Sequence, residues 1–367
     1  NYCSARKWRV SLSSSVFPHE SNPAKSALQL NLSGHRTKPL PVWFMRQAGR
    51  SLPEYRKLRA TAGLLECCLT PELAVEISLQ PVRRHGVDAA IFFSDITVPL
   101  VLAGLPIKII PNLGPTLEDP IRRLEDLKRL RSISSEDLEP ITQAVTMLVR
   151  ELGTTPLIGF GGAPFTLASY LIEGGPSKDL PYTKYIMKSE PRLWEGILGW
   201  CAEITAAFVQ AQVDSGAQAL QIFDSWAGKL SGDEYRNFAA PYSQILFSKL
   251  EDVSGVEQAQ VPRLHFGVGT KGILGDMLSV GATAIGVDSL TTLGEASKIL
   301  ERSSAAGNID PSLLAEPEDV LHSHVRAVLT DGKSLSGHVV NLGHGVPPDT
   351  DPDVLTKLVD LIHTETA

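Results

Sequence analysis

Near its C-terminus the chain reads Ala284-Ile-Gly-Val287, then Ala305-Ala-Gly-Asn-Ile309, then Val339-Val-Asn-Leu342, with longer helical patterns between these apolar runs. The runs are almost continuously apolar rather than alternating, which is typical of parallel strands buried on both faces. Eight such runs alternating with helices favour an α/β fold built as a single (β/α)8 TIM barrel; an open, doubly wound parallel sheet is the alternative. The five earlier runs are Pro41–Met45, Ala89–Phe93, Leu157–Phe160, Ala219–Phe223 and Arg263–Phe266.

Capping signals place three helix starts. Thr70-Pro71-Glu72 combines an N-cap residue, a first-turn proline and an acid near the positive end of the helix dipole. Ser231-Gly-Asp-Glu234 has the spacing of a capping box. Asp351-Pro352-Asp353 opens a last helix whose apolar residues recur at helical spacing, at Leu355, Leu358, Val359 and Ile362.

Composition limits the class of protein. The chain has 367 residues, 43% hydrophobic and 20% charged, so it can form two medium-sized domains or one large barrel. A net charge of -7 argues against a nucleic-acid binder, which usually has a basic face, although local charge can still bind a small anion. No apolar run reaches the roughly 18 residues of a membrane span. We therefore expect neither a nucleic acid nor a membrane as a partner.

The N-terminal segment differs in composition from the rest. Residues 1–16 contain three basic residues, a serine-rich stretch and no acid, which faintly resembles an organellar transit segment. We expect residues 1–22 to be a flexible tail and residues 23–367 to form the barrel. Reduced thiols and a cytoplasmic location are expected because the cysteines show no CxxC spacing; they are Cys3, Cys67, Cys68 and Cys201.

One glycine motif resembles a dinucleotide-binding loop. Gly267-Val-Gly269-Thr-Lys-Gly272 follows a strand and opens a helix, and Asp288 ends the next strand. The motif comes late in the chain, however, whereas dinucleotide-binding domains usually carry it in their first βα turn. Tight glycine turns also join strands to helices in barrels. We interpret this motif as a structural turn.

The loop after the first strand is strongly basic. Between Arg46 and Arg59 five basic residues fall within fourteen positions, opposed only by Glu54. Barrel enzymes build their active sites at the C-terminal ends of the strands. A guanidinium group matches a carboxylate bidentately and stays charged at any working pH. The loop therefore predicts a site for an anionic ligand, and Gly49 would let that ligand approach the backbone.

Other polar residues follow later strands. Asp95 comes directly after Phe92-Phe93 and is either a helix N-cap or a site residue. Tyr170 follows a glycine-rich loop, on a helix where core packing is the alternative to ligand contact. Ser225 stands at a strand end without the Gly-x-Ser-x-Gly elbow of a nucleophile. His344, flanked by glycines after the final strand, is expected to be exposed and to serve the site.

Metal and nucleotide motifs are missing from the sequence. The cysteines are not grouped, and neither a His-x-Cys pair, an HExxH motif nor a P-loop occurs. No metal and no cofactor is expected.

These segments together closely resemble the uroporphyrinogen decarboxylase family, from about Ala24 to His363. The resemblance implies a single (β/α)8 barrel that forms a homodimer. It also implies removal of the four acetate carboxyls of uroporphyrinogen III, giving coproporphyrinogen III for haem and chlorophyll synthesis without cofactor or metal. The resembling blocks, in the family's order, are Pro41–Arg56, Phe93–Asp95, Gly159–Gly175, Ile222–Gly228 and Asn341–Pro348.

The resemblance further implies roles for individual residues. Asp95 would lie under the centre of the macrocycle, accept hydrogen bonds from its pyrrole N–H groups and stabilise the transition state. Arg46 and Arg50 would grip substrate carboxylates and act in catalysis. The other implied substrate-binding residues are Gln47, Ala48, Gly49, Arg59, Tyr170, Ser225 and His344, with Arg56 as a further source of positive charge.

The chemistry fits these residue types. Loss of CO₂ from an acetate side chain needs an electron sink, usually a cofactor. A pyrrole protonated at a ring carbon is its own sink, and a preorganised carboxylate would stabilise that cation. The proton donor stays open between an arginine, His344 and ordered water.

Two other functions are compatible with the same fold. A corrinoid-linked methyltransferase of the same superfamily would need zinc ligands such as a His-x-Cys pair, which this sequence lacks. A porphyrin-binding protein without turnover is the second alternative.

The chain departs from the family's usual residues at three positions, Ser51, Ser289 and Ala306. These departures put the details of the substrate in question rather than the activity.

Overall fold

The structure is a computed structural model that describes residues 25–111, 113–251 and 260–367. A parallel sheet forms its centre. Neighbouring strands run in the order β1-β4-β5-β6-β7-β8-β9, and every pair is parallel. The expected tail (1–22) and Cys3 lie outside the described residues. The strands are β1 (Ala90–Ile91), β4 (Leu157–Gly162), β5 (Ala219–Phe223), β6 (Arg263–Phe266), β7 (Ala284–Gly286), β8 (Ser304–Ala306) and β9 (His338–Val339).

Residues 41–45 close the sheet into a barrel. On one side Val42 pairs in parallel with Val340, and the N–H of Val340 donates to the carbonyl of Pro41 over 2.9 Å. On the other side the N–H of Asp88 donates to the carbonyl of Val42 over 2.8 Å. The chain before β1 therefore joins β9 to β1. The predicted barrel is confirmed, and the alternative of an open sheet is wrong.

The predicted strand Pro41–Met45 is nevertheless only an isolated bridge. Its N–H groups turn mostly to side chains: Val42 donates to the Asp88 carboxylate, Phe44 to the amide oxygen of Gln47 and Met45 to that of Asn341. Side-chain acceptors thus replace much of the backbone ladder. The segment still alternates like a strand, because Trp43 and Met45 pack inside the barrel while Val42 and Phe44 face the helices.

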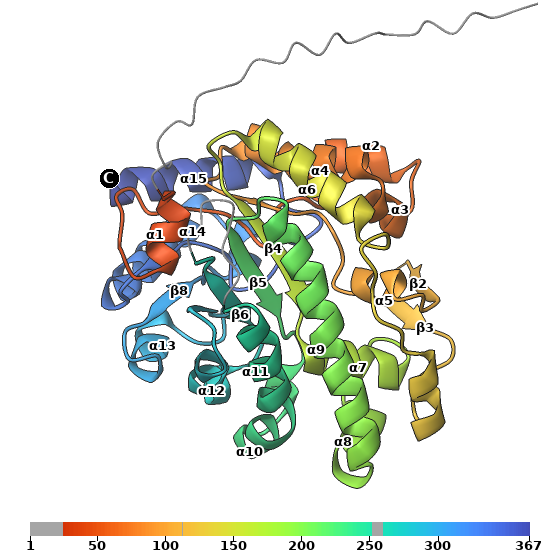
Figure 1. Cartoon of the computed structure of the whole chain (residues 1–367). Helices are drawn as coiled ribbons and strands as arrows, with labels where there is room; N and C mark the ends of the chain where they lie inside the picture. Colours follow the sequence, from red (N-terminus) through yellow and green to blue (C-terminus); the bar gives the residue numbers. More distant parts are fainter. Residues whose placement is uncertain (1–24, 112, 252–259) are drawn as a thin grey trace, which may run out of the picture.

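Helices cover the outside of this sheet, with the long α9 crossing β4 and β5 in the view of Figure 1. Apolar clusters fill the space between sheet and helices, and a smaller cluster fills the barrel itself. The helices are α1 (Ala27–Leu32), α2 (Pro53–Arg59), α3 (Leu64–Leu69), α4 (Pro71–His85), α5 (Val98–Leu102), α6 (Glu139–Leu152), α7 (Pro164–Glu173), α8 (Pro181–Ser189), α9 (Pro191–Asp214), α10 (Gly232–Glu234), α11 (Ala240–Lys249), α12 (Leu274–Ser279), α13 (Leu293–Ile299), α14 (Glu318–Asp331) and α15 (Pro352–Thr366).

Helix α1 closes the amino-terminal end of the barrel. Leu28 and Leu32 belong to the interior cluster and are each 1% exposed. The side-chain oxygen of Asn31 accepts from the N–H of His338, at the start of β9. In barrel enzymes the opposite, carboxyl end of the strands carries the site.

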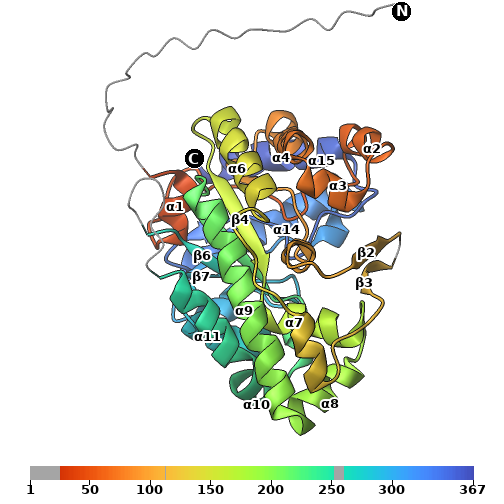
Figure 2. The same ribbon diagram turned by 45° about the vertical axis from the view of Figure 1, so that its right-hand side comes forward.

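The three predicted helix starts are present, with one difference in detail. Ser231 forms the capping box with Glu234, and Asp351 accepts from the N–H of Asp353. Thr70 is the N-cap residue of α4, but its hydroxyl makes no capping hydrogen bond. A two-stranded hairpin, β2 (Ile107–Ile110) with β3 (Gly114–Leu117), was not predicted and projects from the side of the barrel (Figure 2).

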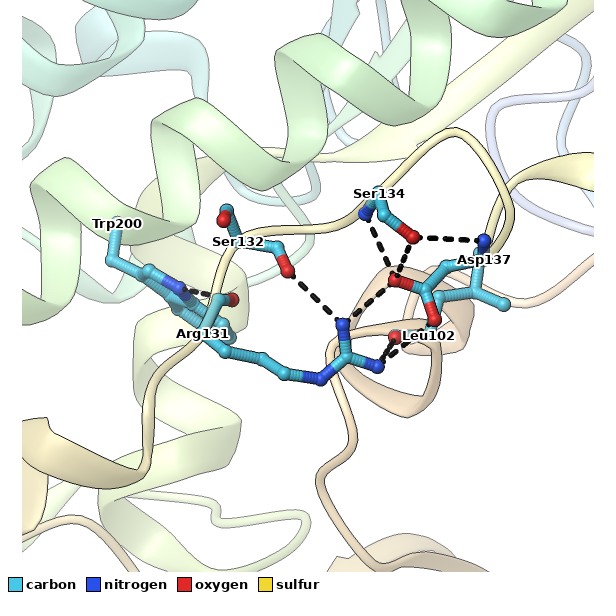
Figure 3. Close-up of polar contacts among 6 residues, drawn as sticks. All are labelled: Leu102, Arg131, Ser132, Ser134, Asp137 and Trp200. Atoms are coloured by element: carbon cyan, nitrogen blue, oxygen red, sulfur yellow. Dashed lines mark hydrogen bonds and ion pairs between the residues drawn. The ribbon is translucent and has the colours of Figure 1, made fainter.

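An ion pair fixes the connection that leads into α6. The Arg131 guanidinium binds both carboxylate oxygens of Asp137 and also donates to the carbonyl of Leu102 at the end of α5 (Figure 3). The Trp200 ring on α9 donates to the Arg131 carbonyl. Hydrogen bonds from Arg131 and Ser134 hold the pKa of Asp137 well below its usual range. The cluster joins three helices and is structural.

Candidate active site

The loops that follow the strands meet at the carboxyl end of the barrel. Residues 41–45 lead into Arg46, β1 into Asp95, β5 into Ser225, and the segment after β9 into His344. Because all of these segments run parallel in one closed sheet, the four predicted site residues lie at the same, carboxyl end of the barrel, which we call the mouth.

Arg46 has an unusual backbone conformation, with φ at 60° in the left-handed region. Its neighbours fix it there: the N–H of Met45 donates to the Asn341 side chain over 2.8 Å, and the N–H of Val346 donates to the Met45 carbonyl over 2.8 Å. The exposed side chain of Arg46 makes no hydrogen bond or ion pair with any residue that the structure describes. Its guanidinium is therefore available to an anion.

Gln47 has a different place from the one expected for a ligand contact. Its side chain is fully buried, accepts from the N–H of Phe44 over 2.9 Å and donates to the carbonyl of Ala89 over 3.1 Å. Gln47 therefore ties the basic loop to the start of β1. Ala48 and Gly49 are half-buried, and a side chain at Gly49 would lie 2.9 Å from the carbonyl oxygen of Arg46.

The remaining arginines of this loop divide into two groups. Arg50 is exposed, and its side chain has no polar partner within the described ranges. Arg56 instead donates to the carbonyls of Arg50 and Ser51, over 2.7 and 3.2 Å, so it supports the loop that carries Arg50. Arg59 donates to the carbonyl of Ala62. Arg46 and Arg50 are thus the two guanidinium groups of the loop without internal partners in the described chain.

The Asp95 carboxylate is held on one side and open on the other. Its Oδ1 accepts from the Thr97 hydroxyl over 2.5 Å and from the Thr97 N–H over 2.9 Å. No described residue donates to Oδ2, and Asp95 is half-buried. Asp95 is not the N-cap of α5, which is Thr97; its carboxylate instead forms the turn before that helix and leaves one oxygen without a donor in the described chain.

Tyr170 and the β5 loop meet at the same place. The Tyr170 ring stacks on Trp226, with centroids 4.3 Å apart, and Trp226 follows Ser225 directly. Burial raises the pKa of Tyr170 to about 12, with a further upward contribution from the charge of Asp95 and an opposing one from Arg46. Tyr170 is thus a neutral hydroxyl that lies within the electrostatic reach of Asp95 and Arg46.

His344 is exposed at the mouth, as its flanking glycines predict. Desolvation of the ring lowers its pKa, Arg46 lowers it further and Asp288 opposes both. The imidazole is consequently predominantly neutral at pH 7. It can donate one hydrogen bond and accept another.

An aromatic floor lies below these polar groups. Phe223 meets Phe160 and Phe266 edge to face, at centroid distances of 5.5 and 6.0 Å. Phe160 and Phe266 are buried in the barrel interior, while Phe223 is half-buried. This end of the barrel therefore combines an apolar interior with polar and charged side chains on the loops around it.

The glycine motif of β6 is a structural turn, as interpreted from the sequence. The buried Asp288 accepts from the N–H of Gly269 and also from that of Leu290. Its carboxylate thus joins the loops after β6 and β7 instead of facing a ribose. Within residues 25–111, 113–251 and 260–367, no group of three or more His, Cys, Asp or Glu side chains could hold a metal ion.

Three residues at the mouth were not identified from the sequence. Thr97 and Asn341 orient Asp95 and the Arg46 loop, and Trp226 supports Tyr170. The Asp-x-Thr spacing is a signal for Thr97, because a side chain two residues on readily bonds an aspartate. Trp226 and Asn341 carry no comparable local signal, since their partners lie far away in the sequence.

Comparisons with known proteins bear on the family and on the fold. Uroporphyrinogen decarboxylase from Salinispora tropica is 52% identical over 354 residues, which are 95% of this chain and 93% of that protein. The enzyme from Streptomyces avermitilis is 50% identical over 354 residues, 95% of this chain and 98% of its own. A solved methyltransferase from Methanosarcina mazei has a TM-score of 0.76 at 21% identity over 93% of this chain and 98% of its own, which shows a shared fold. The family profile "Uroporphyrinogen decarboxylase (URO-D)" matches residues 24–365, and the chain belongs to that family.

Proposed function

We propose that the mouth formed by Arg46, Arg50, Asp95, Tyr170 and His344 is the catalytic site for the family's reaction. That reaction is the cofactor-independent decarboxylation of the acetate side chains of uroporphyrinogen in tetrapyrrole biosynthesis. The observation that carries the assignment is the state of Asp95: one carboxylate oxygen is bound to Thr97, and the other has no donor among the described residues.

Asp95 supplies the charge that the reaction needs. Protonation of a pyrrole ring carbon creates a cation, and cleavage of the acetate C–C bond then sends its electron pair into that ring as CO₂ leaves. A second proton then adds to the exocyclic carbon, and the first proton leaves the ring carbon, which gives the methyl product and restores the neutral pyrrole. A fixed carboxylate beside the pyrrole N–H groups stabilises the cation most where its charge is greatest, in the transition state.

Arg46 and Arg50 bind the peripheral carboxylates. Both side chains are exposed at the mouth, and a charge-assisted hydrogen bond to a carboxylate is about twice as strong as a neutral one. Tyr170, Ser225 and the neutral His344 offer uncharged hydrogen bonds to further side chains of the substrate.

The proposal also covers the domain organisation, the oligomeric state and the cellular location of the protein. Residues 23–367 act as one domain, the protein works as a homodimer and its location is cytoplasmic. No helix in the described ranges is long and apolar enough to cross a membrane. Analytical ultracentrifugation tests the dimer, because a monomer at micromolar concentration would contradict it.

Anaerobic incubation with uroporphyrinogen III tests the proposed site. Chromatography should show stepwise loss of four carboxyl groups with the native chain, little loss with Asp95→Asn, and native rates with Arg83→Ala, which changes an exposed ion pair on α4. Binding without loss of carboxylates would favour a porphyrin-binding protein. Turnover by Asp95→Asn at the native rate would remove Asp95 from the site.

A further inference from the structure

The side chain of Arg46 lies flat on Gly345. A Cβ atom built on Gly345 would fall 2.3 Å from Cδ of Arg46, 2.8 Å from Cγ and 3.0 Å from Nε. These are atoms along the stem and at the base of the guanidinium, so the whole side chain would have to move. Gly345 itself is buried and is not in the left-handed region. An alanine there would add a methyl group without straining the backbone.

The backbone of Arg46 is fixed by the same segment. Asn341 accepts from the N–H of Met45 over 2.8 Å and from that of Leu342 over 2.7 Å, and Val346 donates to the Met45 carbonyl. The left-handed conformation of Arg46 costs free energy for a residue with a Cβ atom, so it persists because these bonds require it. Observed strain of this kind is a reason to look for a function.

We propose that Gly345, together with Asn341, is a positioning residue that aims the Arg46 guanidinium at a substrate carboxylate. The idea rests on the proposed function, in which Arg46 binds that carboxylate. Arginine has many rotamers, and a stem that packs against Gly345 loses less conformational entropy when the ligand binds. The last loop of the barrel thereby sets the geometry of the first.

A double-mutant cycle tests the proposal. The variants are Gly345→Ala, Arg46→Ala and both together, with Gly272→Ala as the matched control, since nothing lies within 4 Å of a Cβ atom at Gly272. We expect Gly345→Ala to raise KM about 10-fold with a smaller change in kcat, as for lost uniform binding. In the Arg46→Ala background the same change should alter KM less than about 2-fold, and Gly272→Ala should match the native protein.

The outcomes separate this proposal from the one it rests on. If Arg46→Ala weakens binding but Gly345→Ala costs as much with or without Arg46, the positioning role is wrong and the site assignment survives. If Arg46→Ala leaves both kinetic constants unchanged, both proposals fail. Should Gly345→Ala not fold, Asn341→Ala replaces it in the cycle, with Asn341→Asp as the variant expected to rescue, because a carboxylate keeps the oxygen that accepts from Met45 and Leu342.

Discussion

Thr97→Val should slow the chemical step while leaving the fold intact. The Thr97 hydroxyl donates to Oδ1 of Asp95 over 2.5 Å, and the Thr97 N–H donates to the same oxygen over 2.9 Å. Valine keeps the shape of this fully buried side chain and removes only the hydroxyl. The hydroxyl does not cap α5, so the helix should not be affected.

The size of the effect follows from the remaining bonds. A hydrogen bond to a charged group contributes about 1.5–3 kcal/mol, and Asp95 is only half-buried and keeps its bond from the Thr97 N–H. We therefore expect a loss of about 1–2 kcal/mol in the transition state, or roughly 5–30-fold in kcat. Thr97→Ser keeps the hydroxyl and should retain most of the rate.

Steady-state kinetics and thermal unfolding of both variants measure this directly. A native kcat in Thr97→Val, with Tm also unchanged, would refute the idea that Oδ1 must be held for Asp95 to act. An equal loss of kcat in Thr97→Ser would mean that the methyl packing rather than the hydroxyl matters.

Three further outcomes follow from the structure. Arg46→Ala or Arg50→Ala should each weaken binding by about 1.5–3 kcal/mol, roughly 10–150-fold in substrate affinity, and unchanged kinetic constants in either variant would remove the basic loop from the site. Burial lowers the pKa of His338 to about 4, from about 6.5 in the unfolded chain, so the unfolded state takes up the proton first as the pH falls. The stability that the neutral ring gives is complete above about pH 6.5 and is lost as the pH falls through 4, by up to about 1.4 kcal/mol per pH unit. Urea unfolding at pH 7 and pH 5 should therefore show a smaller acid destabilisation in His338→Asn, and an equal one would contradict the assignment. Finally, chelators should leave the protein active without added pyridoxal phosphate or nicotinamide, whereas activity that returns only with one of these would mean that the substrate is not its own electron sink.

The positions of the strands were predictable where both faces are buried. Ala219–Phe223 and Arg263–Phe266 match β5 and β6 residue for residue. The ends of strands were less predictable where side chains, instead of a neighbouring strand, accept the hydrogen bonds of the backbone N–H groups. Residues 41–45 show this, because Asp88, Gln47 and Asn341 accept their N–H groups and leave only a bridge. A choice between backbone and side-chain partners depends on distant parts of the chain, which periodicity does not report.

At the candidate site, the sequence predicted at which end of the barrel the residues lie better than it predicted what each side chain contacts. The carboxyl ends of parallel strands lie at one end of a barrel, so the sequence could place Arg46, Asp95 and His344 at that end; their roles there stay a prediction. The sequence could not show that Gln47 would turn inward or that Arg56 would bind carbonyls of its own loop. Each of these depends on which way a side chain leaves a tight turn, and neighbouring residues of a loop often point in opposite directions.

The most direct test of the mechanism is the turnover number of Asp95→Asn. The amide oxygen can still accept both bonds from Thr97, so the loop should keep its shape, while an NH₂ group replaces the open Oδ2. We predict near-native unfolding behaviour, a modest change in KM and a loss of about 10²–10³ in kcat, the usual effect of removing one preorganised electrostatic partner. Near-native kcat in this variant would mean that Asp95 serves only to form the turn before α5, and it would contradict the proposed mechanism.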